Sequence, residues 1–125
     1  MKQNGIRVTG TVVYSKQQGF LGMEAGADFI APYFNRMENL GIDPDDVIAS
    51  LAEMIALYDY PTQILAASFK NAGQVDRAFL AGAQTATMDP SILEGMLAQP
   101  HITGAVDAFD ADWKSIHGNT LICDL

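Results

Sequence analysis

The alternation of strand-like and helix-like segments is the feature that most constrains how this chain can fold. Four short runs are apolar, at residues 6–13, 28–33, 62–69 and 85–88. Nearly unbroken apolar runs of this kind, such as the β-branched first one, are typical of strands buried on both faces. The segments between them repeat apolar residues at helical spacing, as does a last segment at about residues 103–117. This alternation predicts an α/β fold with a parallel sheet flanked by helices.

Capping residues predict where several helices begin and end. Ser15 and Asn71 are each followed three residues later by glutamine, which makes a capping box. Asp43 offers an N-cap carboxylate before a proline at the first helical position. In the helix that follows Asn71 we expect Phe79 to point inward, and we expect Pro100 to stop the helix before it.

Two architectures satisfy this order of elements. One is an open, doubly wound sheet, and the other is four consecutive βα units of a (β/α)₈ barrel, about half of the usual ~250 residues. No glycine-rich phosphate loop follows any of the predicted strands, so a nucleotide-binding domain has no support. The residues by themselves leave the choice open. In either case we expect one domain over residues 1–118, including the last helix, and a tail at 119–125.

The composition excludes several classes of function. The 125 residues hold 15 Asp and Glu against 7 Lys and Arg, so no basic patch is available for a nucleic-acid partner. Asp107, Asp110 and Asp112 are interpreted as a solvated helix face and not as a metal site. Cys123 is the single cysteine, which prevents an intrachain disulfide. We find no signal peptide and no membrane-spanning run, and we expect a cytoplasmic protein.

The segment Ala31-Pro32-Tyr33-Phe34-Asn35-Arg36 ends the second predicted strand with unusual chemistry. Pro32 has no backbone donor and therefore belongs at the end of a strand. Tyr33 supplies a phenol and Arg36 a fixed cationic fork in the loop that we expect to follow. Taken alone, the segment favours a packed tyrosine with a solvated arginine over a polar site.

Three segments in one register resemble the C-terminal half of the transaldolase family, in its fructose-6-phosphate aldolase-like branch. They read TGTVVY at residues 9–14, AGADFIAPYFNR at 25–36 and LAASFK at 65–70. The Ala81-Gly82 pair before a short strand and Trp113 in the last helix match as well. The resemblance covers about residues 5–118, and it favours the C-terminal half of a (β/α)₈ TIM barrel with one further C-terminal helix.

The resemblance implies class I aldol chemistry, in which a lysine forms a Schiff base with the donor carbonyl of a sugar phosphate or small hydroxyketone. Thr11 resembles the threonine that helps to hold the catalytic water, and Tyr33 the tyrosine that positions or activates it. Arg36 and Ser68 resemble the groups that bind the substrate phosphate. Asn35, Ala67 and Lys70 match neighbouring motif positions without an assigned role. We expect no cofactor and no metal.

The Schiff-base lysine of the family has no counterpart in this chain. By resemblance it lies on an earlier strand of the barrel, whereas the lysines present are Lys2, Lys16, Lys70 and Lys114. Lys70 is the one near a predicted strand end, but a Schiff-base lysine needs desolvation or a neighbouring cation. We therefore expect a natural or cloned fragment that is active only when completed.

A half barrel leaves two sheet edges and an apolar inner face uncovered, and both favour association. Two copies could close an eight-stranded barrel, or a separately encoded N-terminal half barrel could supply the lysine. The edges could also refold into a flavodoxin-like open sheet. By resemblance, the last helix could pack on a neighbouring subunit. The alternative to an aldolase subunit is a non-catalytic remnant that oligomerises and binds phosphate or a sugar phosphate.

Overall fold

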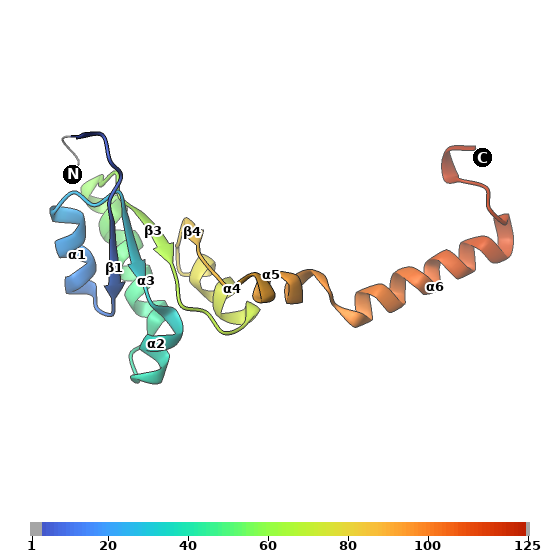
Figure 1. Cartoon of the computed structure of the whole chain (residues 1–125), viewed down its shortest axis with the longest axis horizontal. Helices are drawn as coiled ribbons and strands as arrows, with labels where there is room; N and C mark the ends of the chain where they lie inside the picture. The colour runs from blue at the N-terminus through green and yellow to red at the C-terminus, as the bar shows by residue number, and fades with distance from the viewer. Residues whose placement is uncertain (1–3, 125) are drawn as a thin grey trace.

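The computed structural model describes residues 4–124, which form a parallel sheet with helices between its strands (Figure 1). The sheet has the order β1-β2-β3-β4, with all neighbouring strands parallel. Its strands are β1 (Thr9–Val13), β2 (Phe29–Pro32), β3 (Gln63–Ala66) and β4 (Thr85–Ala86). The helices are α1 (Lys16–Glu24), α2 (Phe34–Asn39), α3 (Pro44–Tyr58), α4 (Ala72–Leu80), α5 (Pro90–Leu97) and α6 (Pro100–His117), followed by the 3₁₀ turn η2 (Ile122–Asp124).

The strictly sequential strand order decides between the two predicted architectures. In a doubly wound sheet the strand order reverses at a switch point and the helices divide between two faces. Here α1 contacts α3, α3 contacts α4, and α4 contacts α5, so these helices form one layer in chain order. The fold is α/β, with four parallel βα units arranged as in half of a TIM barrel.

The core lies between the sheet and this single helix layer. Ile30 of β2 and Ile64 of β3 are fully buried against Ile48 and Leu51 of α3. Val75 extends the same cluster from α4. Every second residue of the central strands therefore faces the helices, as the two-residue period of a strand requires.

The prediction that the first strand is buried on both faces is wrong. Thr9 and Thr11 are exposed, Val12 is 45% exposed, and of the β1 residues Val13 alone is buried. The physical reason is that β1 lies at an edge of the sheet and the helices cover one face. The strand is also shorter than expected, since Ile6 lies before it and is exposed.

Three local predictions are corrected as well. Arg36 lies in helix α2, not in a loop, because Phe34 and Met37 are both fully buried and hold that short helix on the core. Helix α6 begins at Pro100 and not at about residue 103, since proline lacks only a donor that the first turn does not use. Helix α5 does end near Pro100, at Leu97, as predicted. Phe79 points outward from α4 and is 45% exposed.

The predicted helix starts are confirmed by their capping hydrogen bonds. The Gln18 backbone N–H donates to Ser15 Oγ over 3.2 Å, and the Gln74 backbone N–H donates to Asn71 Oδ1 over 3.0 Å. Asp43 Oδ1 accepts from the first-turn backbone of α3 over 3.0 and 3.3 Å.

Helix α6 extends away from the sheet and the other helices (Figure 1). Ile102, Val106, Phe109 and Ile116 recur along one side of it and are all more than half exposed. None of the α6 residues is buried, and Gly118 ends the helix with a φ of 63°. No helix within residues 4–124 is both long and apolar enough to cross a membrane. The predicted boundary at residue 118 stays a prediction.

Substitution of Gly19 tests the packing of α1 on α3. A Cβ at Gly19 would lie 2.4 Å from Cδ2 of Leu51, which is fully buried and cannot move aside freely. We expect Gly19→Ala to lower the free energy of unfolding by about 1–3 kcal/mol, as overpacked cores do. The matched control is Gly95→Ala in α5, where a Cβ meets nothing within 4 Å. It should be neutral or stabilising by about 0.5–1 kcal/mol. Equal urea midpoints for both variants would contradict this account.

Candidate functional site

The backbone pairing of β2 continues past the end of the strand and places Tyr33 between β1 and β3. Pro32 ends β2, and its carbonyl accepts from the Ala67 N–H over 2.9 Å. The Tyr33 N–H then donates to the Val13 carbonyl over 3.1 Å, on the β1 side. The Phe34 N–H donates in turn to the Ala67 carbonyl over 2.8 Å, on the β3 side. Tyr33 therefore lies at the carboxyl edge of the sheet, where barrel proteins place their functional groups.

Thr11 and Tyr33, the two residues predicted to act in catalysis, are brought together at this edge. Thr11 Oγ1 donates to the Tyr33 phenol oxygen over 3.1 Å, from the neighbouring strand β1. Thr11 is exposed and Tyr33 is half-buried, so both hydroxyls can be reached from solvent. Paired hydroxyl groups can hold a water molecule and pass a proton.

Arg36 adds a positive charge to the same group of side chains. Its Cζ atom lies 5.0 Å from the centroid of the Tyr33 ring, in a cation–π arrangement. The Tyr14 ring meets the Tyr33 ring edge-on, with centroids 6.0 Å apart and an interplanar angle of 71°. The pKa of Arg36 lies above its ordinary value, first because of its side-chain hydrogen bond with Tyr14. Tyr14 and Arg36 also line one shallow hollow of about 270 Å³.

Tyr14 is the member of this group to which the sequence assigned no role. It lies inside the segment at residues 9–14 that carries the family resemblance, directly after β1. An aromatic residue at a strand's carboxyl end was the available signal. Whether Tyr14 contributes to the site depends on which neighbouring strand its ring contacts, and this cannot be predicted from the sequence.

Ser68 lies on the other flank of Tyr33, after β3. Its carbonyl accepts from the Asn35 N–H over 2.8 Å, which ties the chain after β3 to the start of α2. Among the described residues, no hydrogen bond joins the two predicted phosphate-binding residues, Ser68 and Arg36.

Backbone strain also marks this edge. Val12 and Ser68 have φ values of 61° and 63°, a region that costs a residue with a side chain on the order of 1 kcal/mol or more. Such strain is concentrated at functional sites. The third such residue in the described chain, Asp59, has an ordinary explanation because it caps the end of α3.

The buried side chain of Gln74 joins helix α2 to the chain that follows β3. The Gln74 amide donates to Asn35 Oδ1 over 3.1 Å and to the Glu38 carboxylate, and its carbonyl oxygen accepts from the Lys70 N–H over 2.8 Å. Gln74 is 6% exposed, so few waters can replace these partners. One side chain of α4 thus holds both α2, which carries Arg36, and the chain beside Ser68.

Arg77 strengthens the connection between the helices. It forms ion pairs with Glu38 of α2 and Asp45 of α3, and its Cζ lies 5.0 Å from the Phe34 ring centroid. The pKa of Arg77 is raised by Asp45 first and by Glu38 second. These contacts restrain the short helix α2 against its two neighbours.

Among the described residues, no hydrogen bond or ion pair joins a lysine to the Thr11–Tyr33 pair. Lys16 pairs with Asp46 over 2.7 Å, and Lys114 pairs with Asp110 within α6, also over 2.7 Å. Lys70 is exposed after β3. Lys2 falls outside the described residues.

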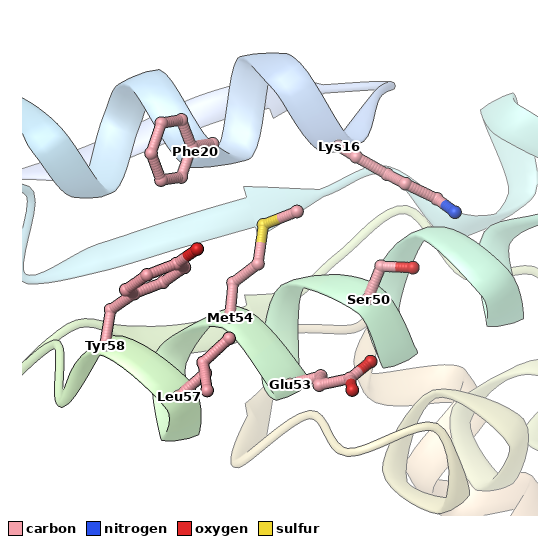
Figure 2. A pocket seen from close by; sticks show the side chains of 7 residues that line it. All are labelled: Lys16, Phe20, Ser50, Glu53, Met54, Leu57 and Tyr58. Carbon is pink, nitrogen blue, oxygen red and sulfur yellow. The ribbon is translucent and has the colours of Figure 1, made fainter.

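A larger hollow lies elsewhere. It is an apolar groove of about 470 Å³ between α1 and α3, with Phe20 on one wall and Met54 and Tyr58 on the other (Figure 2). None of the four predicted site residues lines it. Within residues 4–124, no three His, Cys, Asp or Glu side chains converge in a way that could hold a metal ion.

The class of protein that this fold and site define is the (β/α)₈ barrel type, with polar side chains gathered at the carboxyl ends of parallel strands. The chain belongs to the transaldolase/fructose-6-phosphate aldolase family, whose model matches residues 1–120. It is 47% identical over 122 residues to a protein of Streptococcus pneumoniae described as a probable fructose-6-phosphate aldolase. That match covers 98% of this chain and 55% of the relative, so the chain spans about half the length of the curated relative.

Replacement of Gln74 tests the support behind the site. Gln74→Met keeps the length of the side chain but removes its hydrogen bonds with the Lys70 N–H, Asn35 Oδ1 and the Glu38 carboxylate. We expect it to lower the free energy of unfolding by about 1–3 kcal/mol, the cost of losing several hydrogen bonds at a buried side chain. The control, Gln17→Met on the exposed side of α1, should stay within about 0.5 kcal/mol. Equal losses in urea unfolding would refute the role of Gln74.

Proposed function

We propose that this chain supplies the carboxyl-terminal strands of an active site for class I aldol chemistry on sugar phosphates. The observation that carries the proposal is the 3.1 Å hydrogen bond between Thr11 and Tyr33 at the carboxyl ends of two adjacent parallel strands. Family membership supports the reaction type, and the name of the relative supports fructose 6-phosphate as a substrate. The protein would act in sugar-phosphate metabolism, including pentose phosphates, in the cytoplasm.

Thr11 and Tyr33 have the chemistry that aldol cleavage needs near the breaking bond. In this chemistry a Schiff base at the donor carbonyl withdraws the electrons of the breaking carbon–carbon bond. The hydroxyl on the acceptor side of that bond loses its proton as its carbon becomes the aldehyde. A water held by two hydroxyls can receive that proton. In our proposal Thr11 orients the Tyr33 phenol, and Tyr33 positions this water.

Arg36 and Ser68 are proposed to bind the substrate phosphate. The chain has a net charge of −8, so a phosphate needs a local cation to approach. The planar guanidinium fork matches two phosphate oxygens, and a serine hydroxyl can donate to a third. Both residues border the carboxyl edge of the sheet, where the phosphate would lie.

The nucleophilic lysine is proposed to come from other strands. A Schiff-base lysine must be neutral to attack, which requires desolvation or a nearby cation. Lys16 and Lys114 instead form ion pairs with carboxylates, and Lys70 is exposed to water. None of these three meets the requirement.

We propose that a partner completes the barrel, because one face of the sheet is left uncovered by the described helices. β1 and β4 are the outer strands, and Thr9, Thr11 and Val12 are exposed on β1. A separately encoded N-terminal half barrel would cover this surface and bring the lysine. Two copies of this chain could also close a symmetric barrel, and the apolar side of α6 could pack on a neighbouring subunit.

The second candidate function is a non-catalytic half barrel that oligomerises and binds phosphate or a sugar phosphate. This function is favoured because Lys16 and Lys114 form ion pairs and Lys70 is exposed, so none of the three is suited to form a Schiff base. Phosphate binding by Arg36 and Ser68 needs no such nucleophile.

Borohydride trapping separates the two functions. Incubated alone with fructose 6-phosphate and borohydride, this chain should form no covalent adduct. Mixed with the N-terminal half of the Streptococcus pneumoniae relative, it should restore cleavage and give an adduct on that partner half, as mass spectrometry would show.

In the same mixture, Tyr33→Phe should slow cleavage by about 10²-fold, the usual contribution of proton transfer. Tyr58→Phe, which changes an exposed tyrosine of α3, should not. An adduct on this chain alone would refute completion, and absence of cleavage from the mixture would favour the phosphate-binding alternative.

Light scattering with two charged variants tests the assembly. We expect an oligomer at micromolar concentration, because a lone sheet would expose its edges. If α6 packs on a neighbour, Phe109→Glu should reduce the mass, since Phe109 lies on the apolar side of α6 and is 73% exposed. Ala111→Glu, on the opposite side of the helix, should not. A stable monomer in the wild type would contradict association altogether.

A further inference from the structure

Tyr14 is held in place by the start of helix α1. Its backbone N–H donates to Gln18 Oε1 over 2.8 Å, and the next residue, Ser15, caps the helix. On its other side, Val13 is buried in the core. The Tyr14 side chain therefore starts from a backbone that is restrained in both directions.

The Tyr14 ring completes a group of three side chains with Tyr33 and Arg36. Its edge meets the Tyr33 ring, and the Arg36 guanidinium lies over that same ring. The raised pKa of Arg36 has its hydrogen bond with Tyr14 as the first cause. Tyr14 and Arg36 also line one hollow, so the three side chains form one group although they come from three different places along the chain.

We propose that Tyr14 is a positioning residue that holds the Arg36 guanidinium beside Tyr33, ready to bind an anion. The inference rests on the proposed function of Arg36 as a phosphate-binding residue and names the group that supports it. Arg36 is exposed at the surface of α2, so without a partner its long side chain would sample many rotamers. A side chain that is already ordered loses less freedom when a ligand binds.

The hydrogen bond with Tyr14 leaves Arg36 free to bind phosphate. A guanidinium carries five N–H donors in a fixed plane, and the phenol oxygen needs only one of them. Arg36 and Tyr14 line a hollow of about 270 Å³ together with Asn39 and Leu40, which leaves open space beside the guanidinium for an anion.

Tyr14→Phe tests this role, because it removes the phenol oxygen and keeps the ring contact with Tyr33. We expect inorganic phosphate, titrated by calorimetry into the full chain, to bind the variant about three- to tenfold more weakly than the wild type. In an Arg36→Ala background the same substitution should have no further effect, because Tyr14 acts through Arg36. Tyr58→Phe is the matched control. Equal phosphate affinity in wild type and Tyr14→Phe would overturn the proposal, and so would an equal loss in both backgrounds.

A second readout does not depend on phosphate. The guanidinium protons of Arg36, assigned in NMR spectra by their loss in Arg36→Ala, should exchange with water several-fold faster in Tyr14→Phe. Unchanged exchange would overturn the proposal. If the wild type binds no phosphate, the proposed function of Arg36 fails, and the exchange rate alone decides whether Tyr14 holds it.

Discussion

The backbone hydrogen bonds that continue on both sides of β2 beyond its last residue organise this protein. Pro32 cannot donate, yet its carbonyl and the N–H groups of the next residues still pair with β1 and β3. This pairing places Tyr33 between two parallel strands, one residue before a helix begins. Because all the strands run the same way, their polar ends meet at one edge. Thr11, Tyr33 and Ser68 reach that edge through this arrangement.

Only one face of the sheet is buried by helices in the described chain, and this holds the strands in register while it leaves the other face uncovered. The helix layer removes Ile30, Ile64 and Leu51 from water and so holds the strands in register. Gln74 and Arg77 extend this support to α2 through polar contacts. Within residues 4–124, no helix layer covers the opposite face. A surface of this kind favours a partner, and the missing lysine in our proposal would come with it.

Much of the fold could be predicted from the sequence because its signals are local. The caps at Ser15, Asp43 and Asn71 depend on residues two or three positions away, and each forms the expected hydrogen bond. The wrong predictions concern positions whose structure depends on residues far away in the sequence. Helix α2 forms because Phe34 finds a place in the core, and Phe79 is exposed because the helices beside α4 leave that side uncovered.

The sequence by itself determined the alternation of strands and helices and the family, and it predicted four site residues. Periodicity, capping and strand-end motifs are all written in neighbouring positions of the chain. Tertiary structure alone decided that the sheet keeps a sequential order, that Thr11 and Tyr33 share a hydrogen bond and that Tyr14 reaches Arg36. These relations depend on which strands lie side by side, and on the twist and register that bring residues 20 or more positions apart into contact.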